Sequence, residues 1–143
     1  MRIRTALIAS VVAGLSLASV AHAGPPKGFT KTVDYTDATP DPTGNAGSGN
    51  QDHCTGKLPG EAGIALKVPG PGNVDVTLGG FQGDWALQIK DASGEILGGD
   101  DQNPPAYEST SVRLKKAATI TILPCNLEGT PNGTVTYTYT YKK

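Results

Sequence analysis

The stretch DWALQIKDASGEILGGDD, residues 84–101, determines the fold class predicted for this chain. Its first half alternates apolar and more polar residues, the apolar ones being Trp85, Leu87 and Ile89. This period of two predicts a β-strand with one buried face. The following DASGE, residues 91–95, predicts a turn, because Asp and Ser bond nearby backbone and Gly tolerates a positive φ. The stretch therefore predicts a β-hairpin that continues from Gly98 as an acidic, glycine-containing loop.

Six further segments show the same alternation. They are FTKTVDYT (29–36), GIALKVP (63–69), NVDVTLGG (73–80), STSVRLKK (109–116), AATITILPC (117–125) and TVTYTYTYKK (134–143). The chain holds 19 glycines and 11 prolines, and scarcely any segment has an apolar period of 3.6, so turns rather than helices are expected between the strands. Without helical crossovers a parallel sheet is disfavoured. About eight strands therefore predict an all-β, antiparallel β-sandwich.

The first 23 residues have the features of a secretory signal peptide. Two arginines precede an apolar core, ALIASVVAGLSLASV (6–20), and AHA (21–23) supplies small residues at the cleavage site. The apolar core is shorter than the roughly 20 residues needed to cross a bilayer. We expect cleavage after residue 23, no membrane attachment afterwards, and a single secreted, extracellular domain of residues 24–143.

Two cysteines, Cys54 and Cys125, are present. In an exported chain an even number of cysteines predicts a disulfide. Closing a loop of about 70 residues would stabilise the fold by roughly 4 kcal/mol in the chain-entropy model. A disulfide would also remove both thiols as zinc ligands or nucleophiles.

A polar segment, DATPDPTGNAGSGNQ (37–51), separates the first expected strand from Cys54. It consists mainly of Pro, Gly, Asn, Ser, Thr and Asp and has almost nothing to bury. This composition predicts a flexible loop, of unusual length for a compact domain.

The order of these segments resembles the pre-peptidase C-terminal domain family of secreted bacterial proteins. In that family an apolar strand leads to a D-x-D-L-x-L-x-D-x-x-G hairpin, then an acidic loop, a strand opening with Glu, and a last strand with an aromatic residue. The corresponding parts run in the same order over residues 63–141: VDVTLGG, GDWALQIKDASGEIL, GGDDQNPPAYESTSVRL, KKAATITIL and GTVTYTYTY. The resemblance implies a jelly-roll-like β-sandwich. Because the chain is too short for a peptidase domain as well, we expect a free-standing copy.

Catalysis is not indicated by any motif. His53 is the sole histidine left after signal cleavage, and it lies beside the polar segment, away from any Gly-x-Ser-x-Gly elbow or metal-binding His pair. The mature chain has 10 basic and 13 acidic side chains, since two of the 12 Lys and Arg lie in the signal. This mild negative charge gives no indication of nucleic-acid or anionic-lipid binding. We expect a non-catalytic monomer without a cofactor.

Four carboxylates near the hairpin are candidate calcium ligands: Asp84, Asp100, Asp101 and Glu108. Carboxylate oxygens on strand ends and loops are the ligands that calcium requires, although the spacing is not that of an EF-hand. The alternative is a solvated acidic loop that keeps one end of the sheet soluble. Weak calcium binding is the most that the pattern predicts.

Three tyrosines of the last segment, Tyr137, Tyr139 and Tyr141, share one strand face, and threonines occupy the other. The tyrosines either pack into the core or form an exposed strip on which sugar rings could stack. The sequence thus predicts a secreted binding or accessory module for an unidentified extracellular protein or glycan. A calcium-stabilised structural or cell-surface protein is the alternative.

Overall fold

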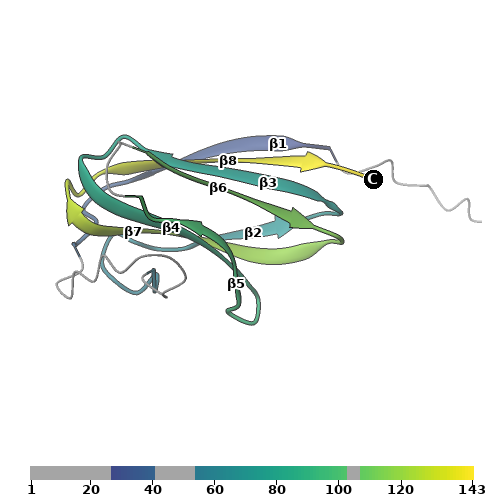
Figure 1. Ribbon diagram of the computed structural model, residues 1–143, viewed down its shortest axis with the longest axis horizontal. Coiled ribbons are helices and arrows are strands. Elements are labelled where there is room, and N and C mark those ends of the chain that lie inside the picture. The colour runs from purple at the N-terminus through teal and green to yellow at the C-terminus, as the bar shows by residue number, and fades with distance from the viewer. Residues whose placement is uncertain (1–26, 41–53, 103–106) are drawn as a thin grey trace, which may run out of the picture.

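A computed structural model describes residues 27–40, 54–102 and 107–143. These residues form eight β-strands arranged as two four-stranded sheets packed face to face (Figure 1). All strand pairs are antiparallel. The described residues contain no helix that could span a membrane. The predicted all-β antiparallel sandwich of about eight strands is confirmed.

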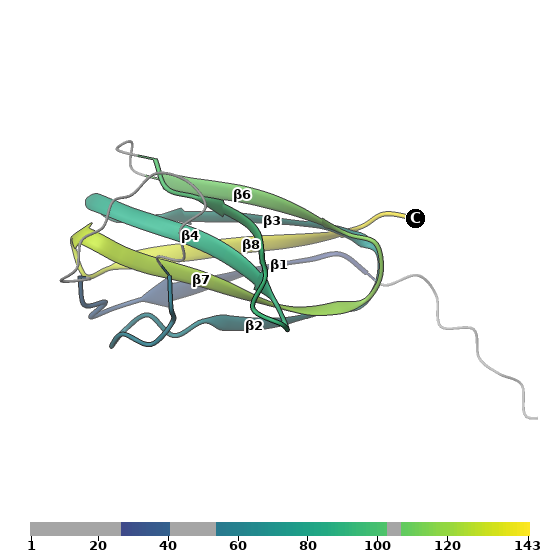
Figure 2. The same ribbon diagram turned by 60° about the horizontal axis from the view of Figure 1, so that its bottom comes forward.

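Each sheet has a defined strand order. Sheet A consists of β1 (Phe29–Tyr35), β8 (Gly133–Tyr141), β3 (Gly72–Gly79) and β6 (Tyr107–Leu114), side by side in that order in Figure 2. Sheet B consists of β2 (Ile64–Val68), β7 (Ala118–Gly129), β4 (Gly83–Asp91) and β5 (Ile96–Asp100). Successive strands alternate between the sheets except at the β4–β5 hairpin. The orders β1-β8-β3-β6 and β2-β7-β4-β5 are those of an eight-stranded jelly roll.

The core lies between the two sheets and is built from the alternating apolar residues. The predicted inward face of β4 is confirmed, because Trp85, Leu87 and Ile89 are all fully buried. Inward residues from the other strands complete the core: Tyr35, Leu66, Val68, Val74, Val76, Leu78, Val112, Ile120, Ile122, Val135, Tyr137 and Tyr139. Removing so many apolar side chains from water supplies the main driving force for folding.

The β4–β5 hairpin has the turn chemistry that the sequence predicts. The carboxylate of Asp91 accepts hydrogen bonds from the backbone N–H groups of Ser93 (2.8 Å) and Glu95 (3.0 Å) and from the Ser93 hydroxyl (2.6 Å). Gly94 has a φ of 91°, which favours glycine. Local side-chain bonds therefore hold the two strands in register.

Strand β4 departs from the sequence prediction in being buried on both faces. Gln88, on the face opposite Leu87, is only 6 % exposed, and Ala86 is buried beside it. The outward face of sheet B carries a second apolar cluster that includes Cys54, Leu123 and other residues from β7. The expectation of a single buried face was wrong because a segment distant in sequence covers the outer one.

The prediction of a loop from Gly98 was also wrong at its start. Strand β5 continues through Gly98–Asp100, with Asp100 opposite Leu87 on β4. A Cβ atom on Gly98 would lie 2.9 Å from side-chain atoms of Thr110 and Val112 on β6. Glycine therefore lets β5 approach the edge of sheet A, at a position where the sequence pattern predicted a loop.

Several predicted features lie outside the described residues. These are the signal segment (1–23), His53 and residues 41–51 of the polar segment. The described beginning of that segment is anchored, since Ala38 is buried and its N–H donates to the Pro131 carbonyl at 2.9 Å.

Candidate functional site

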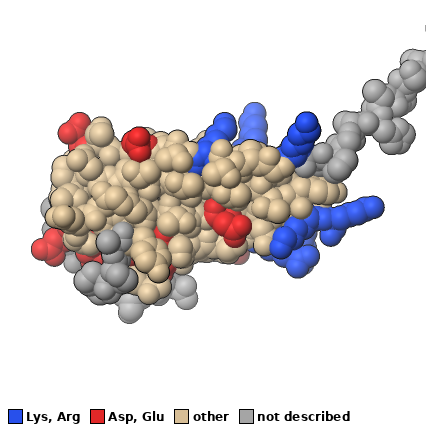
Figure 3. Space-filling model, turned by 90° about the horizontal axis from the view of Figure 1, so that it is seen from above, with Lys and Arg blue, Asp and Glu red and all other residues tan. Residues whose placement is uncertain are grey.

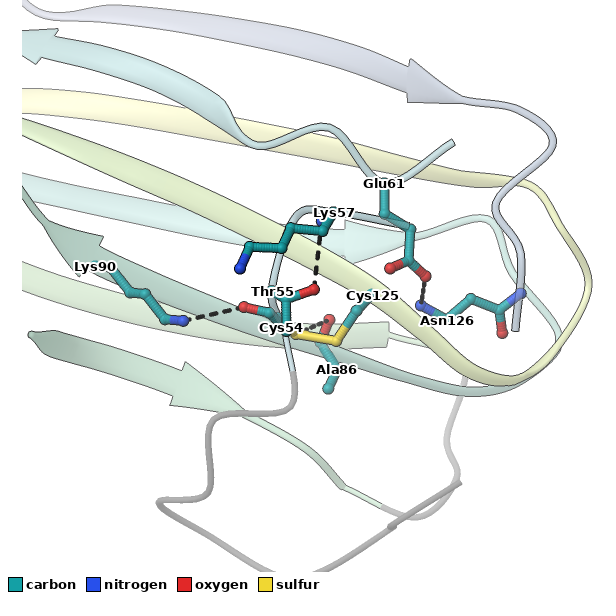
Figure 4. Close-up of a disulfide and its surroundings, with 8 residues drawn as sticks. All are labelled: Cys54, Thr55, Lys57, Glu61, Ala86, Lys90, Cys125 and Asn126. Carbon is teal, nitrogen blue, oxygen red and sulfur yellow. Dashed lines mark hydrogen bonds between the residues drawn. A yellow bond between two sulfur atoms is a disulfide. The ribbon is translucent and has the colours of Figure 1, made fainter. Parts of the chain in front are cut away.

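The predicted disulfide between Cys54 and Cys125 is present, with an S–S distance of 2.01 Å and a sequence separation of 71 residues (Figure 4). It joins the segment before β2 to the outer face of β7. The Cys54 sulfur lies 3.7 Å from the Ala86 carbonyl oxygen, and the Lys90 ammonium donates to the Cys54 carbonyl at 3.1 Å. The segment is thus held against sheet B by a covalent bond and by polar contacts.

A buried polar group within this segment was missed by the sequence analysis. Glu61 is 1 % exposed, and its Oε1 accepts the backbone N–H of Asn126 at 2.7 Å (Figure 4). The Asn126 side-chain amide in turn donates to the carbonyls of Ala38 (3.3 Å) and Thr130 (3.2 Å). The group links three chain segments and is structural in character. A single Glu after a Pro-Gly pair carries no signal by which it could have been recognised.

The four candidate calcium ligands come from the ends of three strands. Asp84 belongs to β4, Asp100 ends β5, Asp101 follows it, and Glu108 belongs to β6. In register, Asp84 lies opposite Glu128. We call this end of the sandwich, with Asp34, Asp37, Asp84, Asp100, Asp101, Glu108 and Glu128, the acidic end.

Glu108 is a buried carboxyl group at the acidic end whose pKa is shifted. It is only 1 % exposed, and its Oε2 accepts the backbone N–H of Gln102 at 3.1 Å. Burial raises its pKa to about 7, and the negative charges of Asp100, Asp101 and Asp84 act in the same direction. The hydrogen bond from Gln102 opposes them. The sequence-predicted carboxylates are therefore close enough to interact electrostatically.

Asp100 is already engaged by protein donors. Its Oδ2 accepts the backbone N–H of Ser109 at 2.8 Å, and its Oδ1 accepts the side-chain amide of Gln102 at 2.9 Å. Within the described ranges, no three His, Cys, Asp or Glu residues are arranged to hold a metal ion. Calcium binding at the acidic end stays a prediction.

The candidate ligand-contact tyrosines lie on the inward face of β8. Tyr137 and Tyr139 are buried, Tyr141 is half-buried against the core, and the Tyr139 hydroxyl donates to the Pro71 carbonyl at 3.1 Å. Phe29 packs on both Tyr137 and Tyr139. Of the two alternatives, packing into the core is the one observed, so Tyr137 and Tyr139 offer no ring face to a sugar.

The outward face of sheet A is instead lined with hydroxyl groups. The pairing register places Thr32, Thr136, Thr77 and Ser109 in one row across the four strands. We call this surface the hydroxyl face. Its nine hydroxyl-bearing residues, all exposed or half-exposed, are Thr30, Thr32, Thr77, Ser109, Ser111, Thr134, Thr136, Thr138 and Thr140.

Hydrogen bonds organise the hydroxyl face. Thr30 bonds Thr138 at 2.9 Å, and Thr32 bonds Thr136 at 3.2 Å, each pair joining β1 to β8. The face also carries two carboxylates that accept hydroxyl protons: Asp75 from Ser111 (2.6 Å) and Asp34 from Thr134 (3.0 Å). These bonds fix the side chains of a plane that remains open to solvent.

Basic side chains gather at the end of the sandwich opposite the acidic end. In Figure 3, which views the molecule from the side of sheet A, Lys and Arg lie on the half nearer the end of β8, and Asp and Glu lie mainly on the other half. We call this region the basic end. Its residues, all exposed, are Lys27, Lys67, Arg113, Lys115, Lys116, Lys142 and Lys143.

Comparison with known proteins adds no family. No family model matches the sequence, and no curated protein matches it either. The resemblance to the pre-peptidase C-terminal domain therefore rests on the order and spacing of the strands alone.

Proposed function

We propose that this protein is a secreted, non-catalytic module that binds an extracellular glycan through its hydroxyl face. The observation that carries the proposal is the contrast between the outer faces of the two sheets. Part of the outer face of sheet B, around Ala86, Leu123 and Cys125, is covered by the segment that Cys54 anchors. The face of sheet A presents ordered hydrogen-bonding side chains to solvent.

The chemistry of the hydroxyl face favours a glycan over a protein partner. Protein interfaces concentrate their binding energy in Trp, Tyr and Arg. Here one large aromatic side chain, Tyr107, stands at the corner of the face and is 57 % exposed. Hydroxyl groups both donate and accept hydrogen bonds, as sugar hydroxyls do. Recognition would therefore proceed by hydrogen bonding along the strands rather than by ring stacking.

Export of the protein is supported by two features. The N-terminal 23 residues have the composition of a signal peptide, and a disulfide is typical of oxidising compartments. We further propose that the module is related to the pre-peptidase C-terminal domain. The intact mass of the secreted protein should correspond to a chain that begins at Gly24 and lacks two hydrogens.

Binding of purified polysaccharides to the secreted protein tests the proposal. The double variant Thr77→Val/Thr136→Val removes two neighbouring hydroxyls of the face while preserving side-chain shape. It should weaken binding about ten-fold, the equivalent of about 1.4 kcal/mol. Thr119→Val, on the outward face of β7 in sheet B, is the matched control and should bind normally. Absence of binding to every polysaccharide, or equal binding by the three proteins, would refute the proposal.

A second candidate function, a calcium-stabilised structural or cell-surface protein, is favoured by the gathering of Asp84, Asp100, Asp101 and Glu108 at one end. A rise in melting temperature with calcium, without glycan binding, would favour this candidate.

A further inference from the structure

We infer that the glycan bound by the hydroxyl face is an acidic polysaccharide, whose negative groups lie against the basic end. The inference rests on the proposed function and specifies its ligand. It follows from the arrangement of charge on the folded protein, which the near-balance of acidic and basic residues in the sequence conceals.

The first observation is the separation of charge along the sandwich. Seven exposed basic residues occupy one end. The carboxylates that approach them are Asp75, one row from Arg113 on the hydroxyl face, and Asp91 and Glu95 in the hairpin of sheet B. Asp91 is already occupied by hydrogen bonds within its own turn. The basic end therefore carries a net positive charge, although the mature chain as a whole is slightly negative. A surface of one sign attracts ligands of the other.

The second observation is that the basic end continues the hydroxyl face. Arg113 lies opposite Asn73, and Asn73 lies opposite Thr140. The three residues form one row of the hydroxyl face, so Arg113 belongs both to this face and to the basic end. The next row contains Ser111 and Thr138. Successive rows are two residues apart along a strand, which is about 6.7 Å. A glycan that contacts the hydroxyl rows would reach the basic end within about two such rows.

The third observation is the kind of cation present. Six of the seven basic residues are lysines, and they come from the segment before β1, from β2, from the β6–β7 turn and from the segment after β8. Lysine is a mobile point charge, whereas arginine offers a planar fork for one carboxylate or phosphate. A spread of lysines suits a polymer with repeated negative groups better than a single small anion.

The surroundings of the basic end favour a polysaccharide over other polyanions. Membrane-binding surfaces insert apolar side chains next to their lysines, and proteins that bind single-stranded nucleic acid stack bases on exposed aromatic rings. Among the described residues, the exposed large apolar side chains are Leu97 and Tyr107, which belong to β5 and to the beginning of β6. Neither belongs to the basic end. Hydroxyl and lysine side chains together match a chain of sugars with acidic groups.

The carboxylates of the face give the bound chain a preferred position. Asp34 lies in the row nearest the acidic end, and Asp75 lies in the row of Thr138. Both would repel a negative group. The neutral hydroxyls of an acidic polysaccharide should therefore contact the row of Thr77 and Thr136, between the two carboxylates, and its negative groups should lie beyond Asp75, against Arg113 and the rest of the basic end.

Polygalacturonate and its fully methyl-esterified form provide a matched pair of probes, since both have the same sugar backbone and only the first is charged. At about 50 mM salt the secreted protein should bind polygalacturonate at least about ten-fold more tightly than the ester. The preference should fall as salt rises to about 300 mM, because screening shortens the range of the charges. Calorimetry or biolayer interferometry measures the two affinities and their dependence on salt.

Charge reversal locates the effect. Lys115→Glu/Lys116→Glu, in the β6–β7 turn, should weaken polygalacturonate binding at least about ten-fold while leaving binding of the ester unchanged. Lys57→Glu, on the exposed segment near the disulfide, is the control and should change neither. Unaltered melting temperatures exclude unfolding as the cause.

The remaining outcomes separate the inference from the proposed function. Equal or tighter binding of the ester would overturn the acidic ligand while leaving a glycan-binding module. Absence of binding to any polysaccharide would overturn both. Tighter binding to single-stranded DNA or to vesicles containing anionic lipid than to polygalacturonate would overturn the inference in favour of that polyanion.

Discussion

The Glu61 carboxylate accepts the backbone N–H of Asn126 at 2.7 Å, and both residues are buried. Asn126 belongs to β7, next to the disulfide-bonded Cys125, whereas Glu61 belongs to the segment that covers sheet B. The disulfide fixes one point of that segment, and the Glu61–Asn126 hydrogen bond fixes another seven residues further along the chain. Together they determine how the segment lies across the sheet.

Replacing Glu61 with alanine should lower the free energy of unfolding by about 2–4 kcal/mol. The change leaves the Asn126 N–H without its acceptor and removes the side chain that fills the site. Urea denaturation measures the loss. Glu128→Ala, at an exposed position of β7, should cost little, and equal effects of the two substitutions would contradict the structural role assigned to Glu61.

Substitutions in β4 test its burial on both faces. Leu87→Ala should cost about 2–5 kcal/mol, because it opens a cavity between the sheets. Gln88→Ala, which a half-exposed strand would tolerate, should cost about 1–2 kcal/mol, because the Gln88 side chain is buried on the outer face of β4. Thr77→Ala on the hydroxyl face is the exposed control. A loss at Gln88 no larger than at Thr77 would show that burial on the outer face of β4 contributes little to stability.

The sequence predicts the fold well where a strand has one apolar and one polar face. Trp85, Leu87 and Ile89 could be assigned to the core because their period of two belongs to the strand itself. Gly98 could not be read correctly, because its role depends on the distance between β5 and Thr110 on another sheet. A glycine placed for close packing and a glycine placed for flexibility are identical in a sequence.

The surface sites also differ in how far the sequence could predict them. The carboxylates at the acidic end could be grouped from the sequence, since the hairpin brings Asp84 and Asp100 to nearby strand ends. The tyrosine face could be named but not assigned to the core or to solvent. The basic end is assembled from four separate segments, and only the strand order brings Lys67, Arg113 and Lys142 to one end. No composition or net charge contains that information.

Calcium should bind at the acidic end weakly, with a dissociation constant of about 1 mM or higher, or not at all. Both oxygens of Asp100 already accept protein hydrogen bonds, and a calcium ion would have to displace donors to gain its six to eight oxygen ligands. Calorimetry with calcium measures the constant. A micromolar value that disappears in Asp101→Ala would mean that the carboxylates rearrange into a true ion site.

The stability of the protein should fall as pH rises through the neutral range, because of Glu108. Its folded pKa of about 7 lies above its ordinary value of 4.5, so the folded state binds the proton more tightly than the unfolded state. The contribution is fully present below pH 4.5 and is lost as the pH rises to about 7. Above that range the buried carboxylate is ionised next to Asp100 and Asp101, which destabilises the folded state.

Glu108→Gln removes the titration while retaining a side-chain oxygen that can accept the Gln102 N–H. The variant should match the wild-type protein near pH 5 and exceed its free energy of unfolding at pH 8, as measured by urea denaturation at each pH. Glu95→Gln, at the exposed hairpin, should leave the wild-type slope unchanged. Asp91 affects the pH dependence of stability in the opposite direction, because the Ser93 hydroxyl lowers its pKa in the folded state. The stability that it contributes is lost only as the pH falls into the acid range. Parallel pH profiles for wild type and Glu108→Gln would show that Glu108 is solvated in solution and carries its charge at little cost.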